Sequence, residues 1–324
     1  AETIPAVLAL VKECFTHSNE QVRKRAVMAL HRFLQKDPDT VTDYQELFRR
    51  AICDRDPSVM SAALNVIHDL AKSSPTAYHN MVPSLVSIIK QVVEHRLPRE
   101  FDYHRMPAPW IQVKLLKILA LLGQANQKAS EEMYEVLQDV MRKGDVGTSI
   151  GCAVMYECVR TITKIYPHAR LLELAAASTS RFITSENPNL RYIGVDALSA
   201  IVQVSPKYAS EHQMVVIDCL EDNDDTLRRK TLDLLYKMTN PHNVEVVVDR
   251  MMAFLTPKYD NFLKKDLVAK ITSLAEKFAP STSWFIRTMN GVFEKGGSLV
   301  EADAAHNLMR LVAEGTGEDE TADQ

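Results

Sequence analysis

The chain has 324 residues, of which 46% are hydrophobic and 25% are charged, and its formal net charge is −4. This composition is that of a folded chain, and the acidic balance argues against a general nucleic-acid binder, which carries a basic domain or stripe. Five scattered cysteines, an odd number, argue against a disulfide framework and favour a reducing, cytoplasmic setting. No apolar run approaches the roughly 18 residues of a membrane span, so we expect any membrane association to be peripheral.

Amphipathic helical patterns recur along the chain after short polar turns. The first apolar residue after each turn marks a repeat, and successive markers are 37, 52, 39, 40, 37, 36 and 37 residues apart. The markers are Val22, Val59, Ile111, Ile150, Leu190, Leu227, Leu263 and, more weakly, Val300. Helix pairs at a period of about 40 residues are typical of HEAT and armadillo repeats. The sequence therefore predicts an all-α fold, a HEAT/armadillo-like α-solenoid of antiparallel helix pairs with about eight to nine repeats.

The longest interval contains an insertion. Residues 94–109, EHRLPREFDYHRMPAP, hold three prolines, two histidines and two aromatic residues, which favours a loop between two helices. Insertions in solenoids gather on one face, often the binding face. The loop is expected either to pack over a neighbouring repeat or to contact a partner.

Two segments invite a chemical interpretation and do not support it. The glycine-rich stretch Lys143–Ala153 lacks the Gly-Lys-Ser/Thr ending of a phosphate loop, so we interpret it as a turn between repeats. An EF-hand calcium loop from Asp222 would need Gly and Glu where Leu227 and Asp233 stand. No histidine or cysteine spacing indicates zinc, so we predict no cofactor, no metal and no enzymatic activity.

The stretch from Ile217 to Met252 shows the repeat most clearly. Its acidic turn offers N-capping oxygens at Asp224, Asp225 and Thr226, and Asn240-Pro241 ends the helix that follows. One face of that helix carries the apolar side chains at i, i+4, i+7, i+8 and i+11, namely Leu227, Thr231, Leu234, Leu235 and Met238.

Short basic clusters stand at equivalent positions just inside three repeats. They are Arg23-Lys24-Arg25, Arg228-Arg229-Lys230 and Lys264-Lys265. Equivalent positions in a solenoid line up along one edge. The residues Arg228, Arg229, Lys230, Lys264 and Lys265 are therefore candidates for a contact with acidic lipid headgroups or an acidic partner. The alternative is a solvated face with no binding role.

We expect the solenoid to fill residues 1–314 as one continuous domain. Residues 315–324 are acidic and are expected to form a mobile tail. Neither end shows a capping repeat with a polar outer face, which terminal repeats need. The chain is therefore expected to be a segment of a longer solenoid.

Several runs of sequence resemble the large-subunit trunks of the heterotetrameric vesicle adaptor complexes. These runs are Phe101–Gly123, Gly151–Ile162, Asn187–Leu198 and Ile217–Met251. Within that family, the run Tyr103–Gln112, YHRMPAPWIQ, looks most like the epsilon class of large subunit, from adaptor protein complex 4. The alternatives are the gamma class of complex 1 and an unrelated HEAT scaffold, such as a transport receptor or a phosphatase scaffold.

The resemblance implies a structural role. Such a trunk would scaffold the small, medium and beta-class subunits for cargo sorting, with the hinge and the ear absent from this chain. An Arf-family small GTPase would recruit the complex, which would lie on the cytoplasmic side of trans-Golgi network or endosomal membranes as a peripheral assembly.

Overall fold

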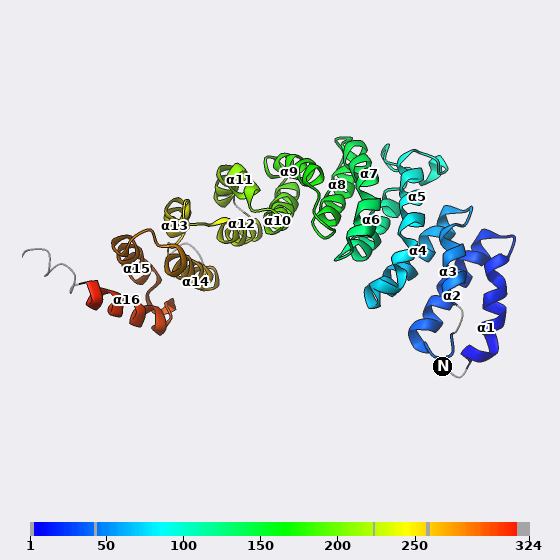
Figure 1. Cartoon of the computed structure of the whole chain (residues 1–324), viewed down its shortest axis with the longest axis horizontal. Helices are drawn as coiled ribbons and strands as arrows, with labels where there is room; N and C mark the ends of the chain where they lie inside the picture. Colours follow the sequence, from blue (N-terminus) through cyan, green and yellow to red (C-terminus); the bar gives the residue numbers. More distant parts are fainter. Residues whose placement is uncertain (1–2, 42–43, 223, 257–259, 316–324) are drawn as a thin grey trace, which may run out of the picture. The chain divides into compact units, whose positions relative to one another are not determined.

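The computed structural model describes residues 3–41, 44–222, 224–256 and 260–315 (Figure 1). These residues form sixteen α-helices, short 3-10 turns and no β-strand, which confirms the all-α prediction. None of the helices in these ranges is both long and apolar enough to cross a bilayer. The chain divides into two compact units, residues 1–178 and 179–324, and the boundary falls within α9 (Ala169–Ile183).

The first unit stacks helical hairpins in two layers. The even-numbered helices pack on one another in chain order, α2 on α4, α4 on α6 and α6 on α8, while α5 packs on α7 in the other layer. The helices are α1 (Ile4–Glu13), α2 (Glu20–Lys36), α3 (Tyr44–Ile52), α4 (Pro57–Ser73), α5 (Val82–Val93), α6 (Pro109–Gly123), α7 (Gln127–Gly144) and α8 (Ser149–Ile162).

The second unit repeats the arrangement. There α10 packs on α12 and α12 on α14, while α11 packs on α12 and α13 on α14 as hairpin partners. The helices are α10 (Pro188–Val204), α11 (Lys207–Asp218), α12 (Asp225–Met238), α13 (Val244–Ala253), α14 (Asn261–Phe278), α15 (Thr282–Gly296) and α16 (Ala302–Gly315). Each hairpin buries its apolar face only against its neighbours, so the structure confirms the predicted HEAT/armadillo-like solenoid.

Side-chain caps fix where the second helix of most repeats begins. A side-chain oxygen accepts a backbone N–H of the first turn at Asn19, Asp56, Thr148, Asn187, Asp224 and Asp260. This satisfies donors that a helix leaves open at its N-terminus. The acidic turn before α12 is thus a helix cap, as predicted, with Asp224 accepting from Thr226 and Leu227.

Four of the eight repeat markers are only partly buried in the structure, namely Val22, Ile150, Leu190 and Val300. Ile150 lies one residue before the buried position, which Gly151 occupies. A Cβ on Gly151 would stand 2.5 Å from the carbonyl oxygen of Gly144, so the close approach of the turn requires glycine there. Val300 precedes α16, and Ala304 is buried in that helix.

The insertion lies between α5 and α6, and its last predicted residue, Pro109, is the first residue of α6. It contains a 3-10 turn at Arg99–Phe101 and a pair of backbone hydrogen bonds between Tyr103 and Met106. The glycine-rich stretch is a turn leading into α8, as predicted. The predicted tail lies outside the described residues beyond Gly315.

Candidate docking groove

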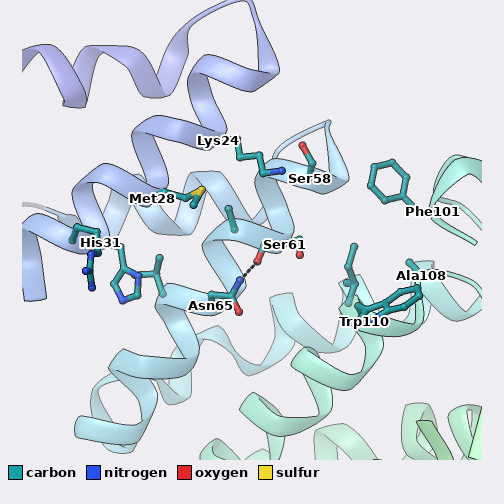
Figure 2. Close-up of a pocket in the computed structure, with 13 residues that line it drawn as sticks. Lys24, Met28, His31, Ser58, Ser61, Asn65, Phe101, Ala108 and Trp110 are labelled. Atoms are coloured by element: carbon teal, nitrogen blue, oxygen red, sulfur yellow. Dashed lines mark hydrogen bonds between the residues drawn. The ribbon is translucent and has the colours of Figure 1, made fainter. Parts of the chain in front are cut away.

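A groove opens along α4, which packs between α2 and α6 (Figure 2). Its floor is a stripe of small side chains on one face of α4, at Ser58, Ser61, Ala62 and Asn65. These positions follow the i, i+3, i+4, i+7 spacing of a single helix face. Because the side chains are small, they leave a volume of about 650 Å³ above the helix.

Larger apolar side chains form the walls of the groove. Met28 of α2 is 54% exposed and Trp110 of α6 is 61% exposed, and Phe101 of the insertion lies near Trp110 (Figure 2). The ring of Tyr103 packs edge-on against Trp110, with 5.0 Å between the ring centroids. Exposed apolar side chains gathered around a hollow mark a surface that binds other molecules.

The insertion that forms one wall of the groove has a strained backbone at three residues. His104, Arg105 and Ala108 have positive φ angles of 47°, 68° and 35°, a region that residues with a Cβ rarely occupy. The buried amide of Gln112 donates a hydrogen bond to the carbonyl oxygen of Pro107 at 2.6 Å. Met106, 2% exposed, anchors the loop in the core. The insertion therefore packs on the repeats and also presents one exposed aromatic ring, that of Tyr103.

The two formally charged side chains that line the groove, Lys24 and Arg32, are both cationic. Lys24, His31 and Arg32 lie on the α2 side, and the lining contains no carboxylate. Two carboxylates lie beside it. Asp56 Oδ1 accepts hydrogen bonds from the N–H and the hydroxyl of Ser58, and Asp69 Oδ2 is 3.2 Å from His31 Nε2. A ligand in the groove would therefore meet apolar walls with positive charge along one rim.

Of the predicted basic residues, Arg228 is turned into the protein. It is 7% exposed, and its guanidinium donates to the carbonyl oxygens of Leu220 and Asp222 and pairs with Asp225. These acceptors belong to the turn before α12 and to its first residue. Arg228 therefore stabilises its own repeat.

The same helix position carries a buried or half-buried arginine in two other repeats. Arg23, four residues after its cap, donates to two carbonyl oxygens of the preceding turn and forms two bonds of 2.8 Å with the carboxylate of Asp54. Arg191 likewise donates to the turn before α10 and pairs with Asp222 at 2.5 Å. Asp54 and Asp222 each lie two residues before the cap of the next repeat. Each arginine therefore couples adjacent repeats.

Arg229 and Lys230 also have partners within the second unit. Arg229 pairs with Asp260 at 2.9 Å and lies over the ring of Phe262. Lys230 pairs with Asp196 at 2.5 Å, and this hydrogen bond raises the pKa of Lys230 against the effect of burial. On α14, Lys264 is half-buried and Lys265 is exposed. Of these five basic residues, Lys265 is the most exposed to solvent and Arg228 is the most buried.

Side chains that could bind a metal ion do not gather in the described ranges. Those ranges contain no group of three or more His, Cys, Asp or Glu side chains placed to bind a metal ion. Complete burial raises the pKa of the Cys158 thiol, which keeps it protonated. The groove of α2, α4 and α6 is the feature that most resembles a binding site.

Stacked helical hairpins of this kind define a HEAT/armadillo-like repeat protein. The family model of the adaptin N terminal region matches residues 1–321, and the chain belongs to that family. Its relatives include AP-4 complex subunit epsilon of Arabidopsis thaliana, 53% identical over 98% of this chain and 34% of that protein. AP-4 complex subunit epsilon-1 of Homo sapiens is 44% identical over 100% of this chain and 28% of that protein.

A relative of the gamma class has a lower sequence identity to this chain than the two epsilon relatives. AP-1 complex subunit gamma of Dictyostelium discoideum is 31% identical over 94% of this chain and 34% of that protein. The similarity therefore favours the epsilon class, as the run Tyr103–Gln112 predicted. The chain spans about a third of the length of the epsilon and gamma relatives it matches.

Two structural similarities support the fold alone. A homology model of the full-length AP-3 complex in an intermediate open conformation matches with a TM-score of 0.61 at 21% identity, over 95% of this chain and 56% of that chain. Yeast importin-β, Kap95p, matches with a TM-score of 0.63 at 13% identity, over 96% of this chain and 40% of that chain.

The groove was not predicted from the sequence. Its signal is the stripe of small residues on α4, beside a helix that presents Met28 and another that begins with Pro109-Trp110. Small residues at helical spacing also occur in ordinary cores, so the stripe alone does not indicate a groove.

Proposed function

We propose that the chain is a trunk segment of an adaptor-complex large subunit of the epsilon class. It would hold the small, medium and beta-class subunits and so support cargo sorting in membrane traffic. The similarity to AP-4 complex subunit epsilon over 98% of the chain carries this proposal.

The proposed mechanism is geometric and involves no catalysis. Stacked hairpins offer broad, rigid helix faces, and pre-organised surfaces lose little conformational freedom on binding. Couplings such as Arg23 to Asp54 fix neighbouring repeats relative to one another, which keeps those faces in register. Subunits bound along such a surface would hold defined positions at a membrane.

We propose that the assembly acts on the cytoplasmic side of trans-Golgi network or endosomal membranes as a peripheral complex, recruited by an Arf-family GTPase. The basic residues of α12 and α14 are candidates for the contact with acidic lipids or with a partner. Lys264 and Lys265 are the first choice because Arg229 and Lys230 already pair with carboxylates.

Co-expression tests the scaffold. The full-length parent of this chain, produced with the small, medium and beta-class subunits, is expected to elute with them as one complex in size-exclusion chromatography. A parent chain that is folded, by circular dichroism, yet elutes alone would refute the assignment.

Charge reversal tests the basic contact. Lys264→Glu with Lys265→Glu is expected to reduce flotation of the assembled complex with vesicles containing phosphatidylserine. Lys128→Glu, at an exposed lysine of α7, is the matched control. Equal flotation of both variants would remove the role of α14.

A further inference from the structure

The groove of α2, α4 and α6 has the size and lining of a site for bulky apolar side chains. Its volume of about 650 Å³ falls within the roughly 300–1,000 Å³ range of ligand pockets. The floor is made of Ser58, Ser61, Ala62 and Asn65, so a ligand could approach α4 closely between Met28 and Trp110.

Trp110 combines exposure to solvent with a fixed position, as residues that dominate binding energies often do. Its ring is 61% exposed, but Tyr103 packs against it and the insertion fixes the backbone just before it. An aromatic ring held in one place loses little freedom when a ligand covers it, and such residues dominate binding energies at interfaces.

Lysine side chains follow along the next turns of α4 and α6, at Lys72, Lys114 and Lys117. Burial, and then the charges of Lys114 and Lys72, lower the pKa of His68; burial and the charge of Lys117 lower the pKa of Lys114. The positive charges of Lys72, Lys114 and Lys117 therefore lie close enough to affect one another. Asp69 opposes them on α4, and Glu157 of α8 is 3.9 Å from Lys117.

Apolar walls beside a cationic surface fit an acidic, apolar polypeptide. We propose that this groove binds an acidic segment of a partner protein, whose bulky apolar side chains enter between Met28 and Trp110 while its carboxylates face Lys24, Arg32 and Lys114. The recessed floor favours a peptide over an anionic membrane, which is too flat to reach it. All the residues that carry the proposal lie in the first unit, so a folded chain that failed to assemble with the adaptor subunits would leave the proposal standing.

A labelled peptide tests this proposal by fluorescence anisotropy on the chain and on the assembled complex. The probe is about 15 residues long, with Leu and Phe along one face and Glu on the other, a pattern suited to a groove. Its counterpart carries Lys in place of Glu. The acidic probe is expected to bind saturably, more weakly as salt rises, and the basic counterpart is expected not to bind.

Three variants locate the site. Trp110→Ala is expected to weaken binding at least tenfold, the loss typical of an interface anchor, and its exposure predicts an unchanged melting temperature. Ser61→Trp fills the floor without changing charge and is expected to have a similar effect. Lys114→Glu is expected to weaken binding severalfold and to reduce its salt dependence, whereas Lys128→Glu on α7 should change nothing.

Several results would overturn the proposal. Equal affinity for the acidic and basic probes, or full affinity in folded Trp110→Ala and Ser61→Trp, would show that the groove does not bind the peptide. Loss of binding in the assembled complex would show that another subunit occupies the groove. Sedimentation with phosphatidylserine vesicles that depends on Trp110 would assign the surface to lipid instead.

Discussion

Removing Arg23 alone from its pair with Asp54 is expected to destabilise the first unit by several kilocalories per mole. Arg23 is 6% exposed and donates four hydrogen bonds, two to Asp54 and two to turn carbonyls. Arg23→Met removes all four and leaves a carboxylate whose side chain is 12% exposed. Breaking a buried pair from one side costs about 3–5 kcal/mol. Asp54 keeps the N–H of Asp56 as a donor, so we expect the lower end, about 3 kcal/mol.

Urea denaturation and hydrogen exchange measure this loss. The protection of amides in α2 and α4 should fall in Arg23→Met, while α10 and α12 keep theirs. Arg191→Met, which breaks the coupling to Asp222, should give the reverse pattern. Adding Asp54→Leu to Arg23→Met should recover much of the stability, because no buried charge then lacks a partner. A loss below about 1 kcal/mol would place the pair among weak surface ion pairs and refute the expectation.

The same pair makes stability depend on pH in the acid range. Burial raises the pKa of Asp54, but the hydrogen bonds from Arg23 and from the N–H of Asp56 outweigh it, so the net pKa lies below its ordinary value. A depressed carboxylate pKa stabilises the fold above the pKa of the unfolded chain, and this contribution is lost as pH falls through the folded pKa. Lowering the pH from about 5 to about 3 should therefore reduce the free energy of unfolding less in Arg23→Met than in the parent chain.

Two further variants and one labelling experiment test the packing. Gly151→Ala places a Cβ 2.5 Å from the carbonyl of Gly144 and should cost about 2 kcal/mol or more in thermal unfolding. Gly291→Ala, whose Cβ would meet only the end of the Met252 side chain, should cost far less, and equal losses would contradict the close approach at Gly151. Exposed Cys53 should react with a thiol reagent at once. Cys219, whose pKa burial raises to about 11, should react only as the chain unfolds; early labelling of Cys219 would count against its burial.

The repeat could be predicted from sequence because its causes are local. Caps such as Asp224 and apolar residues at helical spacing are visible within one repeat. The position of Gly151 was missed by one residue because the close approach of Gly144 depends on how the turn folds back. The groove forms only because neighbouring helices place walls beside the stripe on α4, at Ser58, Ser61, Ala62 and Asn65. The packing of those helices cannot be predicted from one short stretch of sequence.

The role of the basic residues was equally hard to predict. Arg228 and Arg229 are adjacent in sequence, yet one enters the turn and the other reaches Asp260 of the next repeat. The difference follows from their angular positions on α12. The available sequence signal was an Asp two residues before the next cap, as at Asp54 and Asp222, which predicts a coupled arginine in the preceding repeat.

The two arginine couplings share a direction, and this bears on where the chain can be cut into working pieces. In both, the arginine comes from the earlier repeat and the carboxylate from the later one, as in Arg23 with Asp54 and Arg191 with Asp222. A fragment that starts at α3 keeps Asp54 without its arginine, and one that stops after α10 keeps Arg191 without its carboxylate. Met60 stands at the arginine position of α4, so a boundary between α4 and α5 severs no such pair. Expression fragments that begin at α5 should therefore leave neither of these arginines nor their carboxylates without a partner.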